Sequence, residues 1–418
     1  MRNIKHLLAF WINELPTISI KCKNKSSIFR VVGNSLNLKN YIIYYELKRG
    51  IQMKHTFILA LVFFINSFNT AGAFEQPSAE EYFQVWIKDY QSIVEGRGPI
   101  PVEYIENTKP KEPLVGNKKN YDSFFKETNN QSAIVFKNNE LVYETYNNKW
   151  YGSKSNLIHG QSMTKTVTGL TVGALICSGQ ISSINDPLGK YSPTLVDTPY
   201  NRVTIKQALQ MRSGVSKYDP KGTWDIWWMV TGDKERGYAG KNYLKNYIKT
   251  IKSAEGDGKI SEYHPHESHV LSIMVSDLTS KSLGRNFYDL VFSKLKVSGD
   301  FVWMTDADGV TVPTSGLFLQ ARDWATIGSF MGQSINKNDC MGKFLQNGVN
   351  EASESSRLKG WKYGYHFWTH KGLIIFAGFG GQTMYVNAEN QSVVMASSVN
   401  PKYGNSSVFG IASEVVLE

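Results

Sequence analysis

The stretch SAIVFKNNELVYETY, residues 132–146, holds two apolar runs rich in β-forming residues around Asn138-Asn139. Adjacent Asn residues between such runs are typical of a tight turn, so the stretch predicts a β-hairpin. A helix is predicted next, over Ser162–Ser178, because apolar residues recur there at helical spacing and Gly179 acts as a stop signal. A hairpin therefore leads into a helix with an apolar face.

Outward from this helix the chain is helical and then β-rich. Helical or looped segments are predicted at Thr204–Met211, Gly240–Ile251, Ser268–Ser282, Phe287–Leu295 and Ala321–Met331. Short strands are predicted at Gly364–Trp368, Gly372–Phe376, Thr383–Asn387 and Ser392–Ser397, with a last helix at Val408–Val416. This order predicts an α/β (α+β) fold with an antiparallel sheet flanked by helices. The sheet is built from both chain ends, and an all-helical domain is inserted between them.

The N-terminal region has the form of a secretory signal peptide. Met53 is followed by two basic residues, an apolar run over Thr56–Phe68 and an Ala71-Gly72-Ala73 cleavage pattern. The run is too short to span a bilayer, so no stable membrane anchor is expected. A buried N-terminal helix is the alternative interpretation. We therefore expect a periplasmic or secreted protein, cleaved near Ala73.

These boundaries give the expected domain organisation. Residues 1–52 would be a non-native or disordered extension, 53–73 the signal peptide and 74–418 one domain. Within that domain a sheet subdomain would cover about 74–160 and 360–418, and a helical subdomain about 161–359.

The net charge of +10 does not indicate a nucleic-acid partner. Ten of the 46 Lys and Arg residues lie in residues 1–73, where Glu14 and Glu46 are the acidic residues. The remainder is nearly balanced, with 36 basic and 34 acidic residues. Since binding to nucleic acid needs a concentrated basic surface, we expect no nucleic-acid partner.

The part of the chain after Ala73 contains two cysteines, Cys177 and Cys340. Two cysteines in a domain of this size do not form a disulfide framework. Sequence alone cannot place them within bonding distance. We therefore expect two buried free thiols.

Ser162-Met-Thr-Lys165 is one of five Ser-x-x-Lys copies in the chain, and its context distinguishes it. It alone follows the hairpin and opens the long apolar-faced helix. Residues three apart share a helix face, and the first turn of a helix favours developing negative charge. A partly buried lysine has a lowered pKa and can take the serine proton. Ser162 is thus a candidate nucleophile and Lys165 its base; a helix cap with a surface lysine is the alternative.

Two further groups fit this chemistry. Tyr263 stands at the end of a loop just before a predicted helix, where its hydroxyl could relay a proton, although a core tyrosine has the same pattern. Three glycines interrupt the strand region Phe376–Gln382, and glycine in a strand often marks the close approach of a backbone or ligand. A strand N–H there could complete an oxyanion hole with the N–H of Ser162.

The order of these motifs resembles the β-lactamase-related serine hydrolases over residues 130–418. Within them it is most similar to the 6-aminohexanoate-dimer hydrolase branch, which is similar to class C β-lactamases and DD-peptidases. The motifs are the hairpin, Ser162–Thr166, Gln210–Val215, the Tyr263 loop, Gly316–Ala325, Tyr363–Trp368 and Gly378–Gln382.

The resemblance implies a β-lactamase/transpeptidase-like fold and a triad of Ser162, Lys165 and Tyr263. It also implies an acyl-enzyme released by water, no cofactor, and an oxyanion hole from the N–H groups of Ser162 and Phe379. Two departures bear on the substrate: Pro265 replaces an Asn, and Phe376-Ala377 replaces the first two members of a Lys-Thr-Gly triplet. Both remove groups that would hold a β-lactam.

The expected activity is therefore hydrolysis of a small amide, ester or peptide. A penicillin-binding DD-peptidase or β-lactamase, or a non-catalytic binding relative, is the alternative. Trp224, Trp228, Gly378 and Gly380 are expected to line the substrate site, although the tryptophans could instead pack the loop. No metal site is expected, because the two His of His266-Glu267-Ser268-His269 are not spaced as in the zinc-protease motif.

Overall fold

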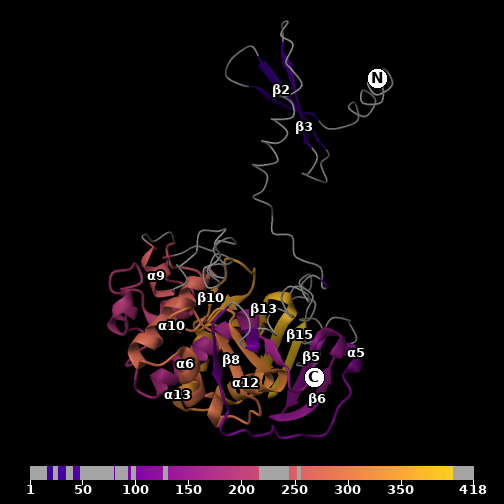
Figure 1. The fold of residues 1–418 in the computed structure, drawn as a ribbon, viewed down its shortest axis with the longest axis vertical. Helices are drawn as coiled ribbons and strands as arrows, with labels where there is room; N and C mark the ends of the chain where they lie inside the picture. The colour runs from indigo at the N-terminus through magenta and orange to yellow at the C-terminus, as the bar shows by residue number, and fades with distance from the viewer. Residues whose placement is uncertain are drawn as a thin grey trace. The chain divides into compact units, whose positions relative to one another are not determined.

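The computed structural model describes residues 80, 93–95, 100–125, 130–215, 244–251 and 256–398, and the backbone of three strands nearer the N-terminus (Figure 1). The chain divides into two units, Met1–Glu75 and Gln76–Glu418. The first contains an antiparallel sheet of β1 (Thr17–Lys21), β2 (Ser27–Gly33) and β3 (Tyr41–Leu47). Residues 1–52 thus include regular structure, and their non-native origin stays a prediction. The expected signal peptide, 53–73, lies outside the described residues.

The second unit contains an eight-stranded antiparallel sheet that joins both chain ends. The predicted hairpin is confirmed: Asn138 and Asn139 turn between its strands with φ of 50° and 64°. Ile134 pairs with Met395 near the other end of the chain. In spatial order the strands are β10 (Ser353–Glu354), β11 (Lys362–Tyr363), β12 (Trp368–His370), β13 (Leu373–Gly378), β14 (Gln382–Asn387), β15 (Ser392–Ser398), β5 (Asn130–Lys137) and β6 (Glu140–Tyr146).

The segment inserted between these strands is not all-helical, which corrects the sequence prediction. It contributes to a four-stranded antiparallel sheet in the order β4 (Val102–Ile105), β8 (Phe301–Met304), β9 (Leu317–Gln320) and β7 (Leu157–His159). β8 is buried at every residue and β9 at three of its four. Short strands buried on both faces lack the period-two alternation that reveals a strand in sequence.

The predicted helices that lie within the described residues form, with shifted ends. The described α-helices are α5 (Asp122–Phe125), α6 (Thr164–Cys177), α7 (Ile205–Leu209), α9 (Leu244–Lys249), α10 (Pro265–Thr279), α11 (Leu283–Leu290), α12 (Ala321–Ser334) and α13 (Cys340–Asn350). The short 3₁₀ helices are η2 (Asn148–Trp150), η3 (Gln161–Met163), η4 (Leu188–Lys190), η5 (Pro193–Leu195), η6 (Phe292–Lys294) and η7 (Phe379–Gly381). None of the helices in the described ranges combines the length and apolar character needed to cross a bilayer.

Two of the observed elements differ from the predictions, and one predicted element is not tested. α13 was not predicted. The predicted strand Gly364–Trp368 is wrong except at its last residue, because Gly364–Phe367 form the turn between β11 and β12, where His366 has a left-handed φ of 67°. The predicted closing helix, Val408–Val416, lies outside the described residues.

Helix α6 runs through the middle of the second unit. It is buried from Thr164 to Leu175, so apolar and small residues occur on all its sides. Two glycines let neighbours approach: a Cβ on Gly169 would meet Tyr365 O at 2.5 Å, and one on Gly173 would meet the Phe344 ring at 2.7 Å. These glycines let α6 pack closely against the turn at Tyr365 and against α13. Helix α12 packs against β5, β14 and β15.

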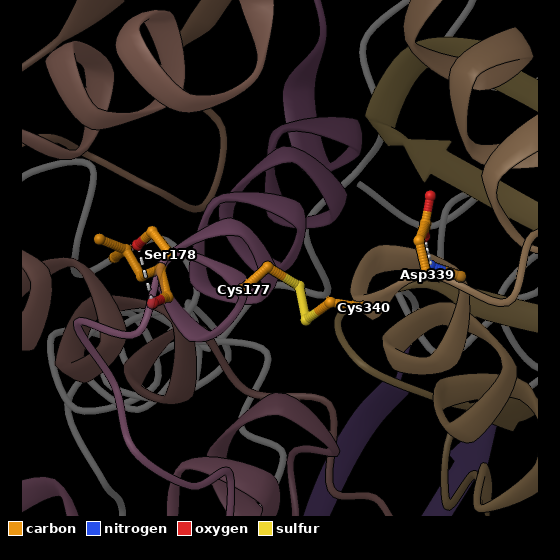
Figure 2. Close-up of a disulfide and its surroundings, with 6 residues drawn as sticks. Cys177, Ser178, Asp339 and Cys340 are labelled. Atoms are coloured by element: carbon orange, nitrogen blue, oxygen red, sulfur yellow. Dashed lines mark hydrogen bonds between the residues drawn. A yellow bond between two sulfur atoms is a disulfide. The ribbon is translucent and has the colours of Figure 1, made fainter.

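Cys177 and Cys340 form a disulfide, which corrects the expectation of two free thiols (Figure 2). The bond joins the last residue of α6 to the first residue of α13, with Cα atoms 5.6 Å apart across a sequence separation of 163 residues. Only the fold brings these two helix ends together. Closing so long a loop lowers the conformational entropy of the unfolded chain. The disulfide therefore stabilises the folded state by roughly 2–5 kcal/mol.

Candidate active site

Ser162 and Lys165 stand at the entry to α6, in the arrangement that the sequence predicts. Ser162 lies in η3 and is half-buried, whereas Lys165 lies in the first turn of α6 and is 4% exposed. Lys165 Nζ lies 3.0 Å from Ser162 Oγ and donates a second hydrogen bond to Thr314 O at 2.9 Å. The amine is thus aimed at the serine from a buried position.

The electrostatic setting of Lys165 favours its neutral form. Burial lowers the pKa of the amine, charge and hydrogen-bond interactions with Tyr263 oppose this, and Arg357 adds to the lowering. A neutral amine 3.0 Å from a hydroxyl can accept its proton. Thr314 is a partner that sequence could not reveal, since it contributes a backbone carbonyl.

The backbone immediately before the serine is strained. Gln161 has φ of 49°, a left-handed conformation that is uncommon for a residue with a side chain. Such strain persists where the surrounding structure enforces it, and it clusters at functional sites. It holds Ser162 at a sharp junction between β7 and α6.

Strand β13 lies against this junction because its last residue is glycine. A Cβ on Gly378 would meet Gly160 O at 2.6 Å and Gln161 Cβ at 3.0 Å, so a side chain there would push the strand away. Phe379, the predicted second oxyanion donor, follows Gly378 directly. The chain then turns through Gly380 and Gly381, whose φ values of 79° and 86° favour glycine. The predicted substrate residues Trp224 and Trp228 lie outside the described residues.

Tyr263 is brought to the same site by backbone contacts of the Gln210-Met211 motif. Ser261 Oγ donates to Gln210 O at 2.7 Å, and Glu262 N donates to Met211 O at 2.8 Å. These bonds fix the two residues that precede Tyr263, and α10 begins two residues after it. The loop is therefore anchored on both sides.

The ring of Tyr263 is enclosed by two aromatic side chains, a lysine and an arginine. It stacks on Trp368 with centroids 5.0 Å apart and meets Tyr363 edge-on at 5.5 Å. Lys165 Nζ lies over the ring at 5.1 Å and Arg357 Cζ at 5.3 Å. Sequence reasoning missed Arg357, which lies in an irregular loop without any periodic signal.

The histidines near Tyr263 do not converge as metal ligands. His266 Nε2 lies 2.9 Å from Tyr247 OH, while His264 Nδ1 accepts from His266 N at 3.2 Å. His269 is fully buried, and burial, followed by Lys165 and then His264, lowers its pKa to about 3. Across the ranges that the structure describes, no group of three or more His, Cys, Asp or Glu is placed to hold a metal ion.

Glu267 is a buried carboxyl group in the first turn of α10, shortly after Tyr263. It is 1% exposed, and the Ser213 hydroxyl donates to its Oε1. Burial raises the pKa of Glu267 to about 8, although hydrogen bonds from Ser213 oppose the shift. The hydroxyl of Ser213, in the Gln210–Val215 motif, is thus connected to the first turn of α10 through a carboxyl group that keeps its proton at neutral pH.

This raised pKa makes stability depend on pH. The folded carboxyl keeps its proton up to about pH 8, whereas the unfolded one loses it near 4.5. The stability contribution is therefore complete below pH 4.5 and is lost as pH rises through the folded pKa, by at most about 1.4 kcal/mol per pH unit. Glu267→Gln, which does not titrate, should stabilise the protein more at pH 8.5 than at pH 5 in urea unfolding. An equal pH dependence in both proteins would contradict this.

Comparison with known proteins identifies the family of this chain. The Beta-lactamase family model matches residues 126–410, which is more than half of the chain. The chain therefore belongs to the Beta-lactamase family, and the resemblance found in the sequence is confirmed. No curated protein sequence matches the chain.

Solved structures with the same fold include hydrolases of several kinds. A 6-aminohexanoate-dimer hydrolase homologue from Bacillus anthracis is 16% identical, with a TM-score of 0.67 over 80% of this chain and 94% of its own. A family VIII carboxylesterase is 14% identical, with a TM-score of 0.54 over 75% and 100%. A penicillin-binding protein from Bacillus halodurans is 15% identical, with a TM-score of 0.54 over 70% and 99%. At these identities the likeness extends to the fold.

Proposed function

We propose that the protein is a serine hydrolase that cleaves a small amide or ester through an acyl-enzyme on Ser162. The observation that supports this most directly is the 3.0 Å contact between Ser162 Oγ and a buried Lys165 amine whose pKa is lowered. A structural lysine would gain more from a carboxylate or from water than from burial beside a half-exposed hydroxyl.

The proposed reaction begins with a neutral Lys165. Its Nζ takes the proton of Ser162 Oγ as the oxygen attacks the acyl carbon, and the N–H groups of Ser162 and Phe379 stabilise the oxyanion. Tyr263 relays the proton from the lysine to the leaving group as the scissile bond breaks. Water then attacks the acyl-enzyme, its proton returns through the same groups, and Ser162 is regenerated.

The residues around β13 support small amides or esters as substrates rather than β-lactams. Phe376 and Ala377, at the first two positions of the triplet, are buried and carry no polar group. Pro265 begins α10 and has no side-chain amide to offer a substrate. Because these positions lack the polar groups that would hold a β-lactam, β-lactamase or DD-peptidase activity is the second candidate function.

A serine-directed fluorophosphonate probe tests the proposal. The purified protein is expected to be labelled covalently, with the adduct mapped by mass spectrometry to the peptide that contains Ser162. Ser162→Ala should remain unlabelled, while Ser293→Ala, in another Ser-x-x-Lys copy, should label like the wild type. Absence of labelling in the folded wild-type protein would favour a non-catalytic relative.

We further propose that the protein is exported. The signal-like segment that ends at Ala73 predicts export, and a disulfide between Cys177 and Cys340 fits an oxidising compartment. N-terminal sequencing of exported protein should then begin at Phe74; retention of Met1 on a folded cytoplasmic protein would contradict it.

A further inference from the structure

The disulfide between Cys177 and Cys340 lies at the surface of the protein. Both cysteines are exposed, and each stands at the end of a helix: Cys177 closes α6 and Cys340 opens α13 (Figure 2). Exposed disulfides are accessible to an attacking thiolate and belong to the more readily reduced and regulatory class. A thiol reagent therefore reaches this bond in the folded protein.

The two joined helices pack against each other and also reach the catalytic region. α6 begins beside Ser162 and reaches Cys177 after 14 residues, about 21 Å of helix. α13 continues from Cys340 for 11 residues, about 16 Å. Between the ends, a Cβ on Gly173 of α6 would meet the Phe344 ring of α13 at 2.7 Å. The disulfide thus fastens α13 to the end of α6 that lies remote from the serine.

The other end of α13 leads to the segment that carries Tyr263. Directly after α13, Glu351 O accepts a hydrogen bond from Gln210 Nε2 at 2.6 Å. In β10, Glu354 O accepts from Ser261 N at 2.9 Å. Ser261 lies two residues before Tyr263, and its hydroxyl donates to Gln210 O at 2.7 Å. The place of Tyr263 therefore depends on where α13 ends.

The two helices differ in how much of their surface is buried. α13 buries one face, made of Gly342, Phe344, Leu345 and Gly348, whereas α6 is buried continuously from Thr164 to Leu175. A surface helix with few buried side chains opens locally at a lower free-energy cost than a core helix. Since the disulfide fixes the first residue of α13, breaking it makes this opening easier and leaves the start of α6 in place.

We propose that the Cys177–Cys340 disulfide is a redox modification site that controls amide hydrolysis through α13. A dithiol gives two electrons and two protons to the bond, so that the S–S bond breaks, two protein thiols form, and the dithiol becomes a disulfide. In the reduced protein α13 opens more often, and Tyr263 loses its support. This inference rests on the proposed function, in which Tyr263 serves the leaving group while Lys165 activates Ser162.

The test measures two reactions before and after reduction. Wild-type protein is treated with dithiothreitol below the melting temperature of its reduced form, and alkylation of Cys177 and Cys340 is mapped by mass spectrometry. We expect kcat for an anilide to fall about 5-fold or more, the size of a modest coupling between distant sites. Acylation by a p-nitrophenyl ester with the same acyl group, which needs no proton for its leaving group, should fall much less. Reoxidation should restore the anilide rate.

Two variants serve as controls for this measurement. The double variant Cys177→Ser with Cys340→Ser should behave like the reduced wild type and should not respond to dithiothreitol. Ile134→Ala creates a cavity in the buried part of β5, which lowers stability by an amount comparable to loss of the disulfide. It should leave the ratio of the two rates unchanged.

Three outcomes would contradict the proposal. If dithiothreitol leaves the bond intact in the folded protein, it is not a redox site. If reduction lowers the melting temperature but changes neither rate, the disulfide only stabilises the fold. If both rates fall equally, reduction loosens the whole protein and does not act through Tyr263.

Hydrogen exchange separates this inference from the proposed reaction, because it requires no turnover. Reduction should speed amide exchange in α13 and in residues 261–263 and leave the first turns of α6 unchanged. If this pattern is seen but the oxidised protein is not labelled by the fluorophosphonate, the coupling is correct and the hydrolase is wrong. If the protein is labelled but exchange in residues 261–263 does not change, the hydrolase stands and the redox control is wrong.

Discussion

Lys165→Met is expected to lower the rate of acylation by about 10²–10⁴-fold or more, the usual contribution of a positioned base. Methionine keeps much of the length and the apolar stem of lysine but has no basic nitrogen. The serine proton then has no acceptor 3.0 Å away. Acylation by a p-nitrophenyl ester, followed by the burst of p-nitrophenol and by intact-protein mass, measures this step directly.

The fold of this variant should persist. Thr314 O loses its hydrogen-bond donor, which costs about 1–3 kcal/mol, but burying a methionine removes the cost of burying an amine. The melting temperature should therefore stay close to that of the wild type. Lys296→Met, which changes an exposed lysine of another Ser-x-x-Lys copy, controls for loss of a positive charge. A near-normal acylation rate in Lys165→Met would show that Lys165 is not the base that takes the serine proton.

The pH profile of kcat/KM provides a second measurement of the same group. Since burial holds the pKa of Lys165 below its ordinary value, the neutral amine forms at a lower pH than for an exposed lysine. Activity should rise with pH as this proton is lost, and the rising limb should be absent from the residual activity of Lys165→Met. If kcat/KM of Lys165→Met still rises over the same pH range, the rise is caused by titration of another group.

Tyr263→Phe is expected to damage amide hydrolysis much more than p-nitrophenyl ester hydrolysis. An amide nitrogen must be protonated before it departs, whereas p-nitrophenolate leaves without a proton. Loss of the hydroxyl therefore affects the amide reaction at bond cleavage. The measurement is kcat for an anilide and a p-nitrophenyl ester with the same acyl group.

Packing around Tyr263 separates this prediction from a structural role. The ring contacts with Trp368 and Tyr363 remain in phenylalanine, so stability should change by about 1 kcal/mol. Tyr385→Phe removes a hydroxyl from another buried tyrosine, on β14, and should leave both rates unchanged. If kcat falls slightly and equally on the two substrates, Tyr263 has only a packing role. The mechanism would then depend on Ser162 and Lys165.

The sequence by itself determined the elements whose signals are local. Two apolar, β-rich runs around Asn138-Asn139 specified the hairpin, and the positive φ of these two residues matches the twist of the strands. The spacing from Ser162 to Lys165 set both side chains in one turn at the entry to α6. The order of strands, helices and strands was also sufficient to predict a sheet made from both chain ends.

Tertiary structure decided whatever depends on contacts between distant segments. β8 and β9 are buried on nearly every side and show no alternation, so their pairing became visible only in the fold. The disulfide required α6 and α13 to bring their ends together. Arg357 gained its place over Tyr263 through hydrogen bonds from its loop to Ser261 and Glu262. Hydrophobic periodicity records which face of an element is buried, but it does not record which distant residue lies against that face.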